Sequence, residues 1–535
     1  MHEILLLCLG LIFSVSLLAV VARKLRIAYP IFLALAGLLL GFLPWVPIIP
    51  IDPDLVFLII LPPILYDAAQ NISLKALWKW RRIVTVMAIG FVLLTATAVA
   101  FVARWLIPGF TWAEGFLLGA IISPPDAAAA SAVLRYIRMP KAIVSILEGE
   151  SLLNDATSLT IFRFALIAIS SSNFAFHQAV TGFLFVSVSG VAIGVVFGLI
   201  FYAIYKWMPT TANLDVALSF VLPYLIYLTA EGLHSSGVLA VVSGGLYISY
   251  QNHFVFSHTS RLKANAIWPA IVFILNAVLF FLIGLQLPVI MEGISSMSVA
   301  GALKIALIIT FVIIVVRMAA GWFSGIFTTF ISRYITVAQS RPGWRNPFIV
   351  GWAGMRGVVS LASALAIPLT MSNGQVFPYR NLILFITFVA IVITLVGQGL
   401  ALPWIVRKVK PEYFSEAKTD EQQIVEIEIQ LQREAIGFMK ENYADDIKKN
   451  RLLKNRLDLL ECKSDLYKDA DTQDDKRGLL GKLTKHYKKI MVLVTEHQRR
   501  ELHTFRRKDH YDDDIIRLIE RRLDLEEERL EEDAE

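Results

Sequence analysis

Thirteen long apolar segments occupy the first 410 residues of this 535-residue chain. A transmembrane helix needs roughly 20 mostly apolar residues, and a chain with many such runs is predicted to cross a membrane repeatedly. We therefore expect an all-α polytopic membrane protein with about thirteen transmembrane helices. They are predicted near residues 4–22, 27–44, 55–70, 83–106, 115–135, 143–170, 177–205, 214–231, 235–250, 266–290, 298–331, 347–369 and 381–406.

Charged residues are concentrated at the other end of the chain. Residues 411–535 hold 32 of the 44 acids and 25 of the 50 Lys and Arg, so the sequence predicts a membrane domain over 1–410 and a cytosolic tail over 411–535. Apolar residues recur at helical spacing in IVEIEIQLQREAIGFM and IIRLIERRLDLEEERL, which predicts helices there, and Asp471–Arg477 is predicted to be a linker. The tail is expected either to aid dimerisation or to bind a regulatory factor.

Basic residues between the segments indicate the topology. Nineteen of them fall in alternate loops, whereas the opposite loops hold Arg104 and Arg380, with Lys304 near a helix end. The positive-inside rule then places the N-terminus outside and the tail in the cytoplasm. The basic side comprises Arg23, Lys24, Arg26, Lys75, Lys79, Arg81, Arg82, Arg135, Arg138, Lys141, Lys206, Arg261, Lys263, Arg333, Arg341, Arg345, Arg407, Lys408 and Lys410.

Several classes of function find no support in the sequence. Its two cysteines, Cys8 and Cys462, lie in the first segment and in the tail, so we expect no disulfide framework and no metal cluster. No phosphate loop or nucleotide fingerprint occurs. We expect no enzymatic activity, no cofactor and no nucleic-acid partner.

Two predicted segments are interrupted in the middle. Segment five contains Pro124-Pro125, which cannot continue a helix, followed by Asp126, a good N-cap. Segment twelve reads GWAGMRGVVSLASALAIP, with three glycines around Arg356. Segments seven apart run in opposite directions, so the spacing predicts two inverted six-helix repeats, with broken helices that cross at a transport site. The alternative is that these breaks are incidental, because glycine and proline are common in membrane helices.

The stretch EGESLLNDATSL, residues 148–159, places scarce acids in an apolar segment. On a helix Ser151 and Asp155 share one face, and Glu150 and Asn154 share the neighbouring face. A carboxylate beside a hydroxyl suits a small hard cation such as a monovalent metal ion. Glu150 needs a partner if it is ionised, and Arg356 or Arg317 can supply it. A carboxylate within a membrane segment that can release a proton and bind a cation in its place is the minimum requirement for cation/proton exchange.

Together with GESLLNDA, the motifs ISPPDA, LPPILYDAA, FFLIGLQL and GMRGVVSLA resemble bacterial cation/proton antiporter family 1. Its members are the NhaP-like sodium/proton antiporters, which are related to the animal exchangers. The resemblance spans residues 1–410 in the family's order. It implies a homodimer in the plasma membrane, with a dimer domain, a moving core domain and elevator-like alternating access.

The resemblance also implies roles for the polar residues that bind the ion. Asp155 matches the family's ion- and proton-binding carboxylate, and Asn154 matches the Asn that separates this family from Asp-Asp relatives. Ser151 matches a supporting ligand. Asp67 matches an acid after Pro-Pro that lies near the ion path.

Other charged residues match structural positions of the family. Glu150 and Arg356 match a buried ion pair, and Arg317 matches the basic residue of the opposite core helix. Asp126 matches the acid of the broken helix, which stabilises the crossing. Many members have Thr before that Asp where this chain has Pro125, so one hydroxyl ligand of the family is absent.

The function predicted from the sequence is electroneutral exchange of one monovalent cation for one proton, with a role in sodium and pH homeostasis. Sodium is the expected cation, with lithium as a further substrate. A potassium/proton antiporter is the alternative within transport. A cation channel and a sensor whose output is the tail are alternatives from other classes. Beyond a second copy and membrane lipids, only the factor at the tail is expected as a partner.

Overall fold

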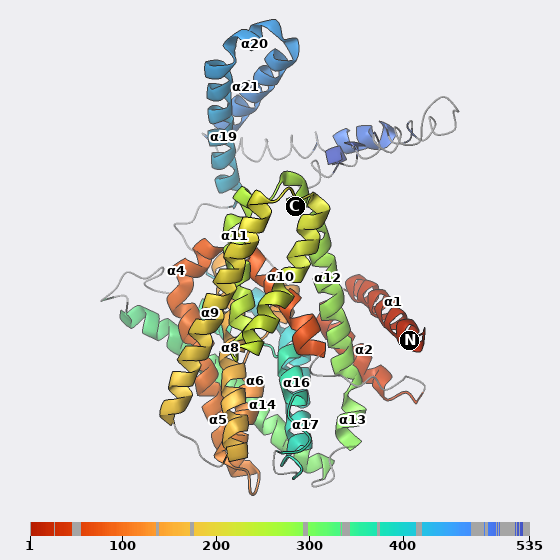
Figure 1. Ribbon diagram of the computed structural model, residues 1–535, viewed down its shortest axis with the longest axis vertical. Helices are drawn as coiled ribbons and strands as arrows, with labels where there is room; N and C mark the ends of the chain where they lie inside the picture. Colours follow the sequence, from red (N-terminus) through yellow and green to blue (C-terminus); the bar gives the residue numbers. More distant parts are fainter. Residues whose placement is uncertain are drawn as a thin grey trace. The chain divides into compact units, whose positions relative to one another are not determined.

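The computed structural model describes most of the chain, in two compact units formed by residues 1–412 and 413–535 (Figure 1). The described residues are 2–25, 27–44, 55–134, 139–171, 176–292, 298–331, 333, 343–371, 375–412, 420–471, 486, 490–498, 500, 502, 519, 522–523 and 525–527. The predicted loop cations Arg26, Arg135, Arg138 and Arg341 lie outside them, as do most of the predicted linker and of the last predicted tail helix.

The first unit is helical throughout its described part. Three short π-helices interrupt its α-helices, and one isolated bridge joins Thr370 to Val376. The elements are α1 (His2–Leu25), α2 (Tyr29–Gly41), η1 (Leu55–Ile60), α3 (Leu61–Asn71), α4 (Leu74–Thr85), η2 (Val86–Phe91), α5 (Val92–Leu106), α6 (Trp112–Ile122), α7 (Ala127–Leu134), α8 (Lys141–Ser171), α9 (Phe176–Trp207), α10 (Ala212–Gly232), α11 (Gly237–Val255), α12 (His258–Leu285), α13 (Leu287–Glu292), α14 (Val299–Ile331), α15 (Arg345–Trp352), α16 (Val358–Leu365), α17 (Arg380–Val392), η3 (Ile393–Gln398) and α18 (Gly399–Val409).

The helices of this unit are long and apolar, as the sequence predicts. By length and composition, seven of the described helices can cross a membrane: Leu74–Leu106, Lys141–Ser170, Thr181–Trp207, Ala212–Gly232, His258–Met291, Val299–Phe330 and Arg380–Val409. Three shorter apolar helices cover Tyr29–Gly41, Val56–Asn71 and Trp112–Ile122. The all-helical class is therefore confirmed for the described residues, whereas the count of thirteen spans and the inverted repeat stay predictions.

Local sequence explains where the helices near the breaks begin and end. Thr111 and Glu114 form a capping box at the start of α6, in which the Glu114 N–H donates to Thr111 Oγ1 at 3.3 Å and the Thr111 N–H donates to Glu114 Oε2 at 2.6 Å. The helix ends before Pro124-Pro125, since proline has no N–H to continue it. In the second predicted break, residues 354–357 are not helical. Both interruptions are confirmed.

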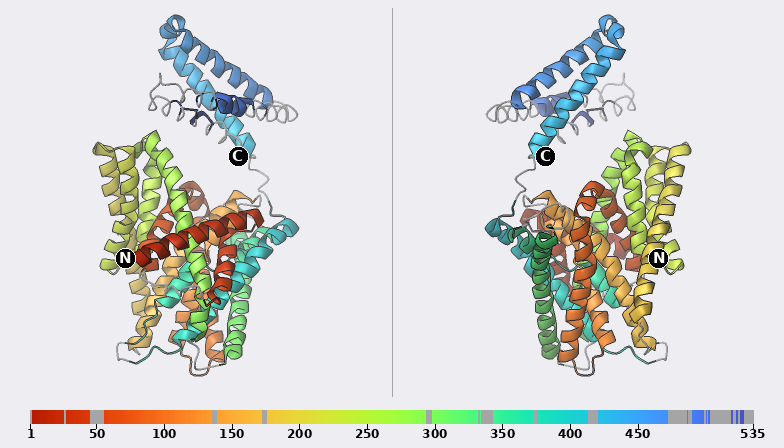
Figure 2. Two further views of the ribbon diagram at one scale, coloured as in Figure 1. Left: turned by 90° about the vertical axis from the view of Figure 1, so that its right-hand side faces the viewer. Right: turned by 90° about the vertical axis from the view of Figure 1, so that its left-hand side faces the viewer.

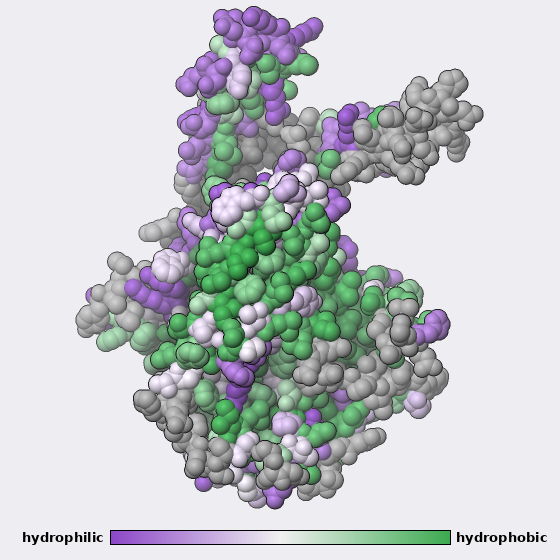
Figure 3. Space-filling view, in the orientation of Figure 1, coloured by the Kyte–Doolittle hydropathy of each residue, from purple (hydrophilic) through white to green (hydrophobic). Residues whose placement is uncertain are grey.

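Packing places α8 among several other helices. It contacts α3, α4, α6 and α11, and α14 lies alongside α5 (Figure 2). Near the middle of the chain, α9 packs on α11 but turns apolar side chains such as Leu184, Phe185 and Val188 outward. The broad hydrophobic face over α9 to α12 is visible in Figure 3. Exposed apolar area of this extent is unfavourable in water and suits a lipid environment.

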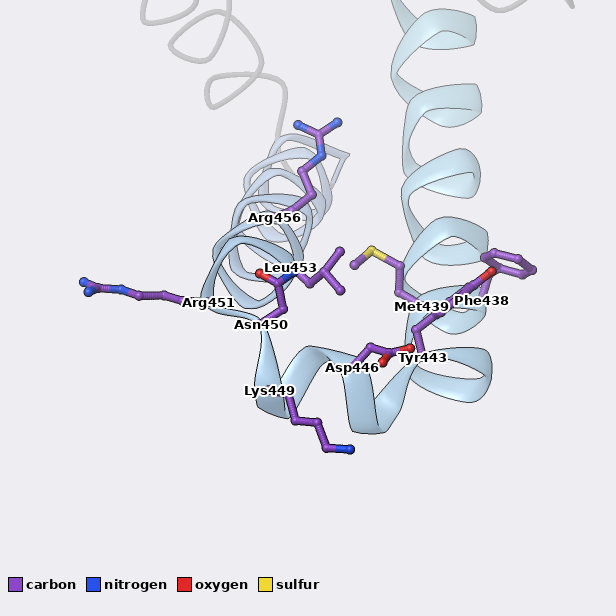
Figure 4. A pocket seen from close by; sticks show the side chains of 9 residues that line it. All are labelled: Phe438, Met439, Tyr443, Asp446, Lys449, Asn450, Arg451, Leu453 and Arg456. Carbon is purple, nitrogen blue, oxygen red and sulfur yellow. The ribbon is translucent and has the colours of Figure 1, made fainter.

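In the second unit, residues 420–471 form a charged helical hairpin. It contains α19 (Asp420–Asn442), α20 (Ala444–Lys449) and α21 (Arg451–Asp471), and α19 packs against α21. Lys440 and Glu461 join these two helices through an ion pair of 2.7 Å. Around the turn lies an open hollow of about 740 Å³, lined by Phe438, Met439, Tyr443, Asp446, Lys449, Asn450, Arg451, Leu453 and Arg456 (Figure 4). The helix predicted in the first half of the tail is thus confirmed.

Candidate functional site

The acid-rich stretch lies within α8. Glu150 and Asn154 are fully buried, and Asp155 keeps only 8% of its surface exposed. Ser151 is partly exposed. A single uninterrupted helix therefore presents all four predicted side chains within two turns, on the two neighbouring faces that the spacing predicts.

The two interrupted segments meet at this site. The Asp126 N–H, just after Pro124-Pro125, donates to the Met355 carbonyl at 2.7 Å. The Asp126 carboxylate lies against Gly357, where it leaves no space for a β-carbon. Each break leaves backbone N–H and C=O groups without helical partners, and this hydrogen bond pairs one such group from each break. Backbone groups of broken helices within a membrane need such partners. The two breaks are in contact, as the crossing predicted from the sequence requires.

Two polar side chains of α8 donate hydrogen bonds to backbone carbonyls around the first break. Asn154 Nδ2 donates to the Pro125 carbonyl at 3.1 Å, and Ser158 Oγ donates to the Ala120 carbonyl at 2.7 Å. Both carbonyls lie where α6 unwinds and lack a helical partner N–H. Ser158 was missed by the sequence reasoning, although its spacing of four residues from Asn154 was a usable signal.

A threonine side chain hydrogen-bonds to the backbone of the second break. Thr394 Oγ1 accepts a hydrogen bond from the Arg356 backbone N–H at 3.1 Å and donates to the Ala390 carbonyl at 2.7 Å. Thr394 lies in η3, and its side chain is fully buried. The sequence reasoning missed it too, and a lone threonine in an apolar helix carries no signal that would have identified it.

Two oxygen-bearing groups beside the first break are available for a ligand. The buried Asn154 Oδ1 has no hydrogen-bond partner, because only the nitrogen of this amide is engaged. Within the described part of the chain, no hydrogen bond or ion pair engages the Asp155 carboxylate. A carboxylate buried this deeply needs either a proton or a cation to neutralise it. The Asp155 carboxylate can thus bind a hard cation through oxygen.

The buried ion pair differs from the predicted one. Glu150 binds Arg317 of α14, whose two terminal nitrogens each donate to one carboxylate oxygen, the second at 2.6 Å. The expected Glu150–Arg356 pair is therefore wrong. Arg317 reaches Glu150 because Gly354 lacks a side chain: a β-carbon there would lie 2.7 Å from Arg317 Nε. The two-pronged guanidinium geometry then occupies both oxygens of the carboxylate.

This pairing leaves Arg356 with an unusual environment. Its side chain is fully buried, and none of its three guanidinium nitrogens has a hydrogen-bond partner among the described residues. Arg356 lies within electrostatic range of both Arg317 and Glu150, and Asp126 lies within range of Asp155. The site thus collects two guanidinium groups and three carboxylates.

Asp67 is carried by a different helix, which packs against α8. It lies on α3 and lines a cavity of about 430 Å³ formed with α10, α11 and α12. Asp155 is not among the residues that line this cavity. Among the described residues no group of three or more His, Cys, Asp or Glu is arranged to hold a metal ion. The predicted role of Asp67 near the ion path stays a prediction.

Comparison with known families identifies the chain at the level of sequence. The family described as "Sodium/hydrogen exchanger, transmembrane" matches residues 10–408. An uncharacterized Na⁺/H⁺ exchanger of Mycobacterium tuberculosis is 31% identical over 534 residues, which cover 97% of this chain and 96% of that protein. A sodium, potassium, lithium and rubidium/H⁺ antiporter of Bacillus subtilis is 32% identical and matches 70% of this chain and 57% of its own length.

The fold has a known counterpart as well. The sodium proton antiporter MjNhaP1 of Methanocaldococcus jannaschii, determined at pH 8, matches with a TM-score of 0.61 and 19% sequence identity. The match covers 76% of this chain and 100% of that structure. At this identity the likeness concerns the fold alone.

Proposed function

Because the chain belongs to the transmembrane sodium/hydrogen exchanger family, we propose that it exchanges a monovalent cation for a proton at Asp155. One observation carries this proposal: Asp155 is a buried carboxylate without a hydrogen-bonded or ionic partner in the described structure, beside two helix breaks that contact each other. The family is one of transporters rather than enzymes, and its apolar helices make the chain a multi-pass membrane protein.

The two substrates compete for one group. A proton neutralises Asp155 directly, whereas a cation does so through the carboxylate with help from Asn154 Oδ1 and Ser151. Oxygen ligands replace the water that a small hard cation loses on entering the protein. Raising the proton concentration should therefore raise the apparent KM for the cation.

The fixed charges around Asp155 are proposed to support this exchange without taking part in it. Glu150 is committed to Arg317 by two hydrogen bonds. Asp126 bonds through its backbone to Met355, next to Arg356, so both charges lie where the two breaks meet. Removing one of these charged residues leaves another buried charge without compensation. We therefore assign them a structural role.

We propose sodium as the principal cation, with lithium as a further substrate. The family's name supports sodium, and the Bacillus subtilis relative is named for four alkali cations. A carboxylate with neutral oxygen ligands does not by itself select ion size, so potassium/proton exchange is the second candidate. The exchange would serve sodium and pH homeostasis across the plasma membrane.

The remaining parts of the proposal concern the assembly. Alternate basic loops support an external N-terminus and a cytoplasmic tail. The outward apolar face of α9 supports contact with lipid or with a second copy in a homodimer. Two broken helices in contact beside one carboxylate support alternating access by movement of the core that carries them.

The proposed function is tested by proton flux in proteoliposomes. With an acidic interior and a fluorescent pH probe, adding sodium, lithium or potassium outside should release protons in exchange for the cation. We expect sodium and lithium to be effective, and choline chloride at equal ionic strength to be inert. Equal inertness of all three alkali cations would contradict cation/proton antiport by this chain.

Exchange is expected to be electroneutral. Asn154 cannot titrate, Glu150 is paired, and arginine side chains stay protonated at physiological pH. One free carboxylate then carries either one proton or one monovalent cation, so both half-cycles move the same charge. Radioactive sodium should not accumulate in proteoliposomes under an imposed membrane potential without an ion gradient. Accumulation that Asp155→Asn abolishes would show net charge movement and refute this stoichiometry.

A further inference from the structure

The tail hairpin has apolar side chains on two opposite sides of α19. Ile429 is buried on a helix that packs against α21. Ile427, Leu431 and Phe438 are instead each more than half exposed. At about 100° per residue these three fall within about 40° of one another and about 160–180° from Ile429. The α19 stripe, formed by Ile427, Leu431 and Phe438, therefore lies away from the buried side of the helix.

A second exposed apolar stripe lies on α21. Leu452 and Leu459 are each more than half exposed, and their spacing of seven residues places them on one face of the helix. Leu457 is buried and lies about 140–160° from both of them. The α21 stripe, formed by Leu452 and Leu459, thus also lies away from the buried side. Two exposed stripes on one charged hairpin indicate an interaction surface.

The two stripes are bordered by opposite charges. Glu434 is exposed between Leu431 and Phe438, three and four residues from them, and Arg456 is exposed between Leu452 and Leu459 at the same spacings. Neither Glu434 nor Arg456 forms an ion pair with a described residue.

The surrounding sequence has the same charge difference. Residues 420–442 hold six acids and two basic residues, whereas residues 444–456 hold two acids and five basic residues. These segments therefore carry net charges of −4 and +3. An acidic apolar face and a basic apolar face are complementary surfaces for each other.

We propose that the two stripes bind each other between two copies of this chain, with α19 of each hairpin packed on α21 of the other. Within one hairpin they cannot cover each other, because both lie away from the side that is buried. A two-fold axis repeats the same contact twice, and the product is a four-helix bundle. An anionic lipid surface or a singly charged partner would suit only one of the two stripes, whereas a second copy suits both. The proposal goes beyond cation exchange and involves no residue of the transport site.

The test is the distance between spin labels on the two copies, measured by pulsed electron paramagnetic resonance on the full chain in detergent. The label is attached at Lys454→Cys in a parent chain that also carries Cys8→Ser and Cys462→Ser. Lys454 is exposed and lies about 160° from Leu452, so the label stays clear of the stripe. One label per chain reports only distances between copies, and we expect a single narrow distance. Leu431→Glu should remove it while leaving each hairpin folded, because Leu431 is exposed within its own chain.

Charge reversals identify the partner helix. Glu434→Lys and Arg456→Glu should each abolish the narrow distance, and both changes in one chain should restore it, because the two faces are then again opposite in charge. Glu426→Lys is the control and should leave the distance unchanged, since it reverses an exposed acid of α19 about 140° from Leu431. No narrow distance in the labelled parent chain, a distance that survives Leu431→Glu, or failure of the double reversal to restore it would overturn the proposal. Because no transport is measured, the result is independent of whether Asp155 performs exchange.

Discussion

Replacing Asp155 with Asn should reduce cation-driven proton release to the background of protein-free liposomes. Asn preserves the size of the side chain, but its amide accepts no proton at physiological pH and has no negative charge to offer a cation. A cation that enters the buried site would then remain uncompensated, which costs several kcal/mol in a low-dielectric environment. The measurement is the proton flux on sodium addition, with the amount of folded protein matched to the wild type.

A buried carboxylate outside the site provides the matched control. Glu114 is 4% exposed and belongs to the capping box at the start of α6. Glu114→Gln makes the same chemical change as Asp155→Asn, and Gln also serves in a capping box. We expect exchange to persist in Glu114→Gln. Flux near the wild-type rate in a folded Asp155→Asn protein would refute the assignment of the transport site.

Removing Glu150 should destabilise the membrane unit by about 3–5 kcal/mol, because it leaves a buried guanidinium without its carboxylate. Arg317 is only 3% exposed and gives both terminal nitrogens to Glu150. Glu150→Ala and Arg317→Ala should each lower the thermal unfolding midpoint in detergent. The double variant should lose less than the sum of the two, because neither charge is then left alone.

The corrected pairing is tested by repeating these measurements with Arg356→Ala in place of Arg317→Ala, alone and combined with Glu150→Ala. Arg356 makes no side-chain hydrogen bond to any described residue, so its coupling to Glu150 should be weaker than that of Arg317. Arg163 and Glu231 form a second, more exposed ion pair, with side chains 42% and 29% exposed. Arg163→Ala is the control and should cost no more than about 1 kcal/mol. Stronger coupling of Glu150 to Arg356 than to Arg317 would contradict the structure.

Local features of the chain were predictable because their causes lie close together in the sequence. Pro124-Pro125 ends α6 wherever the segment is placed, since proline cannot supply the N–H that a helix needs. Residues four apart on α8 share a face by the geometry of the helix, which places Ser151 with Asp155. Long apolar runs predict membrane helices by composition alone. The sequence by itself thus determined the helical class, both breaks and the helix that carries Asp155.

Contacts between distant residues were decided only by the tertiary structure. Glu150 and Arg317 are 167 residues apart, and both Arg317 and Arg356 were chemically suitable partners for that carboxylate. The choice depends on how closely α14 passes the second break, where the missing side chain of Gly354 makes room for Arg317. Such contacts depend on the packing of whole helices, and spacing along one segment carries no information about them.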